Sequence, residues 1–149
     1  MRAVYQRVLS AYVSVEGRIV GKIGQGVLLF LGVETDDGEE QARKLAGKVA
    51  DLRVFSDERG KMNRSVREVG GGILLIPNFT LCGNCRHGRR PEFLRAARPE
   101  TAEPLFRRFA ALLQEAGVQR VETGVFGADM RVFVENDGPV TLMLNTKEW

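Results

Sequence analysis

The chain of 149 residues contains a single histidine, His87, and this scarcity limits the chemistry open to it. A Ser-His-Asp triad or a Cys-His pair would have to use that one residue. A catalytic zinc site built from several histidines is excluded within one chain. An enzyme of this composition would have to work with carboxylates, hydroxyls, backbone amides or groups on its substrate, and we expect neither a metal nor a cofactor.

Long apolar runs and cysteines are also scarce. No apolar run approaches the roughly 20 residues that a membrane helix needs, and the stretch from Met1 to Val8 lacks the apolar core of a signal peptide. Two cysteines in a chain without a secretion signal indicate a reducing compartment. We therefore expect a cytoplasmic protein without a membrane partner.

What is present is the composition of an ordinary globular protein. The 149 residues predict one domain, 1–149, that is long enough to bury a core. Hydrophobic residues make up 44% and charged residues 28%, which is typical of a folded chain. A net charge of +3 permits a nucleic-acid partner without requiring one.

Hydrophobic periodicity predicts runs of strands interrupted by two main helices. We expect strands over residues 2–15, 19–23, 27–33, 53–55, 73–76, 119–122, 130–135 and 140–145, and helices over about 39–52 and 100–116. Strands in runs with two helices between them favour an α+β fold with a mostly antiparallel sheet or an open barrel.

A turn is predicted where Asp137, Gly138 and Pro139 separate the last two strands. Asp-Gly is a strong turn signal, because glycine accepts positive φ without a Cβ clash, and Pro139 fixes its own φ and donates no N–H. Spacing alone therefore predicts a hairpin whose second strand opens on proline. It also predicts a rigid corner with its carbonyls aimed by the backbone.

Arginines are concentrated between residues 86 and 108. Seven arginines and three glutamates give this segment a charge of +4, more than the +3 of the whole chain. Guanidinium groups match phosphate oxygens well, so the segment is either a phosphate-binding surface or the solvated face of a helix.

Two shorter motifs flank the start of this segment. Cys82 and Cys85 form a Cys-x-x-Cys pair close to His87, which leaves open a metal site shared with a second copy, a redox dithiol, or two thiols on a loop. Asn78 and Thr80 follow a buried strand, where an amide, a backbone turn and a hydroxyl suit an oxyanion hole. Thr80 lacks a basic partner and would be a poor nucleophile.

Several stretches together resemble the D-aminoacyl-tRNA deacylase family, also called D-tyrosyl-tRNA deacylases. The similarity runs from end to end, in the order Met1–Val8, Gly60–Asn63, Pro77–Leu81, Gly88–Phe93, Phe126–Met130 and Asn136–Thr141. The resemblance implies a deacylase-type fold and a homodimeric cytoplasmic hydrolase. Its substrate would be the ester between a D-amino acid and the terminal adenosine of tRNA.

The resemblance also implies roles for single residues. A cis Gly138–Pro139 corner would enter the partner subunit's active site and leave no room for an L side chain, with Arg7 supporting it. The remaining expected residues are Phe79, Thr80 and Asn78 for catalysis, Pro77, Met130 and Thr141 beside the substrate, and Arg86, Arg89 and Arg90 on tRNA phosphates. The Phe79 amide would be the oxyanion donor, with assistance from the substrate's 2′-hydroxyl.

The second motif departs from the family pattern Ser-Gln-Phe-Thr-Leu at two positions. Pro77 replaces serine and loses a hydroxyl and an N–H, and Asn78 replaces glutamine. A related animal branch with proline at this position acts on L-alanyl-tRNA and has a trans Gly-Pro bond. Two alternatives therefore stay open: a deacylase editing L-Ala- or Gly-mischarged tRNA, and an inactive relative that binds tRNA.

Overall fold

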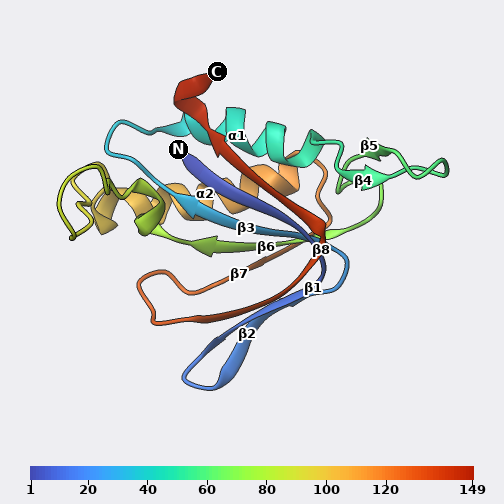
Figure 1. Cartoon of the computed structure of the whole chain (residues 1–149), viewed down its shortest axis with the longest axis horizontal. Helices are drawn as coiled ribbons and strands as arrows, with labels where there is room; N and C mark the ends of the chain where they lie inside the picture. Colours follow the sequence, from blue (N-terminus) through green and yellow to red (C-terminus); the bar gives the residue numbers. More distant parts are fainter.

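The computed structural model describes residues 1–149 as eight strands and two α-helices (Figure 1). In chain order these are β1 (Arg2–Val15), β2 (Arg18–Ile23), β3 (Gly26–Gly32), α1 (Glu39–Asp51), β4 (Phe55–Ser56), β5 (Met62–Arg64), β6 (Gly72–Pro77), α2 (Pro99–Glu115), β7 (Arg120–Thr123) and β8 (Arg131–Asn145), with 3-10 turns η1 (Phe79–Cys82) and η2 (Thr146–Glu148). The predicted α+β class is confirmed.

Six strands form one curled sheet in the order β2-β1-β3-β6-β7, and β8 pairs with β1 outside that path. The pairings of β1 with β2, β3 and β8 are antiparallel, as the sequence predicts, whereas β3 with β6 and β6 with β7 are parallel. Parallel neighbours need a long crossover connection, and α1 and α2 lie in these two connections. The sheet is therefore mixed.

The sheet curls until its two ends approach each other. At Gly21 of β2, an added Cβ would lie 2.9 Å from the Thr123 carbonyl oxygen of β7, and Arg120 donates to the Lys22 carbonyl at 2.8 Å. Seven buried residues, among them Val13, fill the inside of this curl. The result is close to a barrel, as predicted from the sequence.

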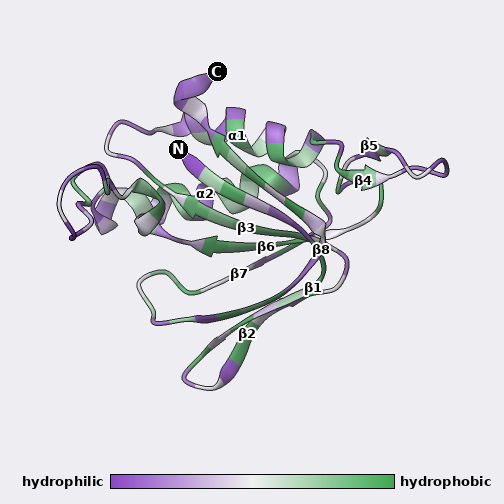
Figure 2. Ribbon diagram, viewed as in Figure 1, coloured by the Kyte–Doolittle hydropathy of each residue, from purple (hydrophilic) through white to green (hydrophobic).

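The larger core lies between the sheet and the two helices, which cover one face of the sheet (Figure 1). Figure 2 shows that β3 and β6 are predominantly hydrophobic, as expected for strands buried on both faces. In α1, Ala42, Leu45, Ala46 and Val49 are all buried, which confirms the apolar stripe predicted from their spacing. No helix of the structure is long and apolar enough to cross a membrane.

The predicted hairpin at residues 136–141 is wrong. Residues 131–145 form one strand, β8, which pairs with β1 on both sides of the corner, from Ser14↔Arg131 to Arg2↔Asn145. The register shifts on either side of Val8, so that the corner is a bulge in a continuous strand. The long partner strand β1 offers pairing to both halves and overrides the local turn signal.

Candidate active site

The end of β6 turns sharply into η1. Pro77 pairs with Leu31 of β3, and the Asn78 N–H donates to the Leu31 carbonyl at 2.8 Å. The Asn78 side-chain oxygen then accepts from the Thr80 N–H at 3.2 Å and also from the Thr80 hydroxyl. Asparagine commonly caps a turn in this way. The side-chain carbonyl of Asn78 is thus occupied by Thr80, and these hydrogen bonds fix the conformation of the strand-to-turn junction.

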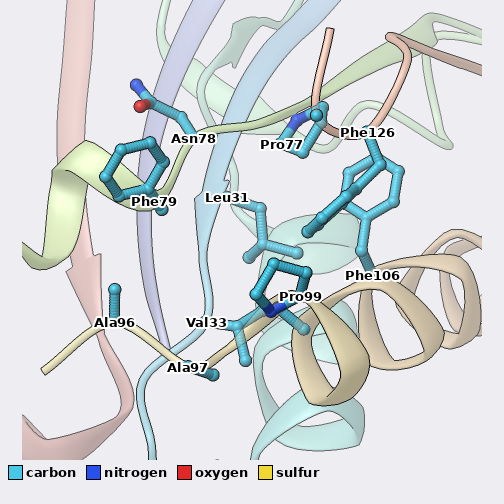
Figure 3. Close-up of a pocket in the computed structure, with 12 residues that line it drawn as sticks. Leu31, Val33, Pro77, Asn78, Phe79, Ala96, Ala97, Pro99, Phe106 and Phe126 are labelled. Atoms are coloured by element: carbon cyan, nitrogen blue, oxygen red, sulfur yellow. The ribbon is translucent and has the colours of Figure 1, made fainter.

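A mainly apolar pocket of about 340 Å³ opens beside this junction (Figure 3). In Figure 3, Phe79 stands on one side of the pocket, Phe106 and Phe126 stand opposite, and Leu31 lies between them. The complete lining is Leu31, Val33, Pro77, Asn78, Phe79, Ala96, Ala97, Pro99, Ala102, Phe106, Phe126 and Gly127. Its size falls within the range of small-molecule sites.

Phe79 combines an exposed ring with a backbone donor at the pocket edge. The ring is 57% exposed and packs edge-on against Phe93, with 5.1 Å between centroids. Because Phe79 is the first residue of η1, its N–H has no partner within that turn. The pocket lining contains no titratable side chain, so the polar chemistry of this site rests on backbone groups and the Asn78 amide.

The second motif forms a fixed corner on β8. The Gly138–Pro139 peptide bond is cis, and Gly138 has a φ of +123°. A Cβ at Gly138 would lie 2.9 Å from Val140 Cγ2 and 3.1 Å from Arg7 Nη2, so this position requires glycine.

The guanidinium of Arg7, on β1, binds the corner at Asp137. Its Nε lies 3.0 Å from the Asp137 carboxylate and 3.3 Å from the Asp137 carbonyl, and its Nη1 donates to the Val54 carbonyl. The Arg7 side chain is only 12% exposed. Arg7 is therefore in direct contact with the corner.

Side-chain amides close the corner on its other side. Asn136 donates to the carbonyls of Arg7 at 2.8 Å and Val140 at 3.1 Å. The Thr141 hydroxyl accepts from Gln6 Nε2 at 3.1 Å. Thr141 thus belongs to the corner, while Gly138 and Pro139 themselves are exposed.

Within one chain the corner and the pocket are separate. The corner lies opposite Arg7, which pairs with Val27 of β3, whereas the pocket begins at Leu31. Four residues of strand span about 13 Å. Met130, in contrast, lies on the pocket side, since a Cβ at Gly124 would meet Met130 Sδ at 2.8 Å and Pro77 Cδ at 3.4 Å.

The arginines of segment 86–108 divide into two groups. Arg86, Arg89 and Arg90 lie exposed on the loop after η1 and form no ion pair. Arg108 of α2 instead bridges two carboxylates, with its Nη2 2.9 Å from Glu39 and its Nη1 2.6 Å from Glu115. Hydrogen bonds from Arg108 hold the pKa of both glutamates below the usual range. Of the seven arginines in this segment, Arg107 and Arg108 bind carboxylates and the other five are free for a ligand.

The two cysteines differ in environment. Cys82 is buried, its thiol donates to the Val33 carbonyl at 3.5 Å, and Cys85 is exposed. Burial, reinforced by Glu34, raises the pKa of the Cys82 thiol to about 11. No group of three or more His, Cys, Asp or Glu side chains is arranged to hold a metal ion.

Most of the pocket wall was not predicted from the sequence. Phe106 is 4% exposed and lies 6.2 Å from Phe126, between ring centroids, yet neither was predicted as a site residue. Ala102 and Phe106 continue the helical spacing of Phe109 and Leu113, which are buried on the same side of α2. That spacing predicts burial, but it cannot show that Phe106 ends in a pocket with residues from β3 and β6.

Comparisons with known proteins agree over nearly the whole chain. Residues 4–145 match the family model described as D-Tyr-tRNA(Tyr) deacylase. A D-aminoacyl-tRNA deacylase of Thermus aquaticus is 54% identical over 148 residues, covering 99% of this chain and 97% of the relative. The corresponding protein of Halalkalibacterium halodurans is 54% identical over 147 residues, covering 99% and 100%.

Solved structures share the fold of this chain over nearly its whole length. A structure described as a c-Myc DNA unwinding element binding protein has a TM-score of 0.93 and 37% identity, covering 97% of this chain and 98% of that one. A probable eukaryotic D-amino acid tRNA deacylase, at 21% identity and TM-score 0.82, shares the fold over 96% of this chain and 97% of its own. With the pocket at η1 and the glycine-proline corner on β8, the chain belongs to the D-Tyr-tRNA deacylase family.

Proposed function

We propose that this protein is a cytoplasmic, homodimeric hydrolase that cuts the ester between a D-amino acid and the terminal adenosine of tRNA. The single observation that carries the proposal is the pocket at η1. It pairs an apolar cavity of about 340 Å³ with the backbone donor of Phe79, in a chain 54% identical to D-aminoacyl-tRNA deacylases along its length.

The pocket accepts the terminal adenosine. Phe79 and Phe126 flank an apolar space into which a flat base fits, and stacking of a base on an aromatic ring contributes about 1–3 kcal/mol. The absence of charged lining residues suits a neutral nucleoside. The ester carbonyl then lies near the mouth of the pocket, where η1 begins.

Catalysis rests on backbone donation and on the substrate. The Phe79 N–H stabilises the oxyanion that forms when water attacks the ester carbonyl. No titratable side chain lines the pocket to act as a base, and the vicinal 2′-hydroxyl of the terminal ribose takes part in proton transfer. Thr80, whose hydroxyl donates to the neutral amide of Asn78, supports η1 and has no base to activate it.

Selection between D and L substrates requires a second copy of the chain. The corner of Gly138 and Pro139 is exposed and lies away from its own pocket, so it acts at the pocket of the partner. β8 pairs on one side only, and its Phe133, Val134 and Met143 side chains are 46%, 44% and 85% exposed. Such an edge with apolar side chains suits an isologous contact.

At the partner's pocket the corner carbonyls hold the α-amino group of the substrate. The side chain of a D-amino acid then points to solvent, while an L side chain meets the backbone of the corner. Because only the α-centre is read, many D-amino acids are accepted and L-amino acids are rejected by steric exclusion.

Pro77 supports one alternative substrate. Its ring lies by Gly124 and Met130, and it lacks the N–H and hydroxyl that a serine would offer. Weaker steric selection at the α-carbon of the amino acid would permit hydrolysis of glycyl- or L-alanyl-tRNA. Turnover of Gly-tRNA or L-Ala-tRNA well ahead of D-Tyr-tRNA would favour this second reading over the first.

Deacylation of D-Tyr-tRNA by two Phe79 variants tests the main proposal. Phe79→Ala keeps the backbone donor and removes the ring, whereas Phe79→Pro removes both. Proline is tolerated at the first position of a turn, where the N–H it lacks has no partner within the turn.

We expect wild type to release D-tyrosine. We also expect kcat of the proline variant to fall about 10²–10³-fold below that of the alanine variant, the usual effect of losing one oxyanion donor. No release of D-tyrosine by wild-type enzyme would contradict the proposed reaction. Equal rates of the two variants would contradict the role of the amide.

A further inference from the structure

A second pocket of about 280 Å³ lies on the other side of η1. Three arginines line it: Arg2 from the start of β1, Arg86 from the loop after η1, and Arg95 from the segment that leads into α2. The remaining lining is the stretch Cys82–Cys85, and no carboxylate contributes to it. Three guanidinium groups converging on one concave surface favour an anion.

The charges of Arg86 and Arg95 are not neutralised within the chain. Both side chains are exposed, and neither forms an ion pair, whereas Arg107 and Arg108 of α2 each bind carboxylates. Arg2 differs, because its Nε lies 3.2 Å from the fully buried Glu34.

The carboxylate of Glu34 does not cancel the positive charge of the pocket as a whole. Glu34 lies 3.2 Å from Arg2 Nε and 3.2 Å from Lys147 Nζ, and Lys147 is also paired with Asp36 at 2.9 Å. Glu34 therefore offsets the charge of Arg2 and leaves those of Arg86 and Arg95 uncompensated. Arg2 also donates from Nη1 to the Leu81 carbonyl at 3.4 Å, which fixes its guanidinium at the base of η1. The pocket as a whole therefore remains positive.

The walls of the pocket are held by backbone bonds before any ligand binds. Asn84 and Glu92 exchange two backbone hydrogen bonds of 2.8 and 3.0 Å, which close the loop that carries Arg86. On the other wall, the Arg95 carbonyl accepts from the Thr35 N–H at 3.0 Å. The backbone that carries Arg86 and Arg95 therefore loses little conformational freedom when a ligand binds.

The pocket lined by Arg2, Arg86 and Arg95, here called the arginine pocket, and the apolar pocket are formed by the same two chain segments. In η1, Phe79 lines the apolar pocket and Cys82 lines the arginine pocket, and in the next segment Ala96 lines the first and Arg95 the second. A nucleoside in the apolar pocket would therefore have the arginine pocket as its immediate neighbour.

We infer that the pocket of Arg2, Arg86 and Arg95 binds the phosphodiester on the 5′ side of the terminal adenosine. The inference rests on the proposed function and extends it. It assigns a phosphate to Arg95 and Arg2, which the sequence did not single out. It also separates Arg86, which lines the pocket, from Arg89 and Arg90, which do not.

Binding of two stable analogues to the intact protein tests this assignment. One is adenosine with D-tyrosine joined through a 3′-amide, and the other carries in addition a methyl phosphodiester on its 5′-oxygen. Calorimetry compares the wild type with Arg95→Gln and Arg86→Gln. Arg107→Gln is the matched control, since it removes the same charge from a side chain that is 77% exposed and outside both pockets.

We expect the diester to raise wild-type affinity about tenfold, as hydrogen bonds between charged groups do. Arg95→Gln and Arg86→Gln should remove most of this gain without changing the affinity for the phosphate-free analogue, and Arg107→Gln should retain it. No gain in the wild type, or a gain that survives in both pocket variants, would overturn the assignment. Equal losses in all three variants would also overturn it, by indicating a general charge effect.

Failure of both analogues to bind, together with no hydrolysis of D-Tyr-tRNA, would refute the proposed function itself. Phosphorus-31 line broadening of inorganic phosphate then decides about the pocket. Broadening by the wild type that Arg95→Gln abolishes would support a site for free phosphate anions. Identical broadening with both proteins, or none with either, would overturn the pocket as an anion site.

Discussion

Replacing Gly138 by alanine should strain the backbone at this position and displace the corner on β8. The φ of +123° at Gly138 is unfavourable for any residue with a Cβ. The added methyl would lie 2.9 Å from Val140 Cγ2, 3.0 Å from the Val140 nitrogen and 3.1 Å from Arg7 Nη2. Both the backbone and the Arg7 guanidinium would have to move.

The expected size follows from the strain. A residue held in such a region costs about 1–3 kcal/mol in free energy of unfolding, which lowers Tm by roughly 2–12 °C at about 2–4 °C per kcal/mol. Because the Val140 backbone and the Arg7 guanidinium must also move, an energy of the same order is lost from the positioning of the corner carbonyls. At 1.36 kcal/mol per factor of ten, kcat/KM for D-Tyr-tRNA should then fall about 5- to 150-fold.

Gly17→Ala provides the matched control. Gly17 also has positive φ, +78°, but a Cβ there would meet nothing within 4 Å. Both variants are assayed for release of D-tyrosine below their melting temperatures. Gly17→Ala should lose stability and keep wild-type kcat/KM. If Gly138→Ala matches either the wild type or Gly17→Ala in kcat/KM, the assigned role of the corner is wrong.

Three further outcomes follow from the site. Thr80→Ala should retain measurable kcat, because Thr80 bonds to the neutral amide of Asn78 and not to a base; complete loss in a folded variant would make its hydroxyl essential. At pH 8, iodoacetamide should alkylate Cys85 in the native protein and spare Cys82, which is buried and has its pKa raised to about 11, so that its thiol stays protonated below that pH; mass spectrometry showing equal labelling would contradict this. His87→Ala should leave kcat/KM and its pH profile unchanged, because His87 lies outside the pocket; a shifted profile would implicate the imidazole.

Much of the fold follows from local patterns. The apolar stripe of α1 and the buried runs of β3 and β6 are set by residues close in sequence, and the structure confirms them. The parallel pairings were not predicted, because they depend on where α1 and α2 carry the chain. The hairpin at residues 136–141 failed because pairing with the 14-residue β1 outweighed a local turn preference.

The residues of the site likewise fall into those that are adjacent in sequence and those that only the tertiary structure brings together. Asn78, Phe79 and Thr80 are adjacent in the chain, so their junction was visible in the sequence. Phe106 and Phe126 enter the pocket from a helix and a distant loop, and only the tertiary structure brings them together. Arg95 was hidden among many arginines until its lack of an ion pair and its place in a pocket set it apart.

Side-by-side deacylation of D-Tyr-tRNA and L-Tyr-tRNA shows whether a site built from backbone groups distinguishes the two configurations of the α-carbon. Enzyme at equal concentration is mixed with each substrate, and the remaining ester is followed over time. Selection at the α-carbon predicts rapid loss of the D ester, with the L ester decaying only at its spontaneous rate. Comparable hydrolysis of both esters, or survival of the D ester, would contradict it.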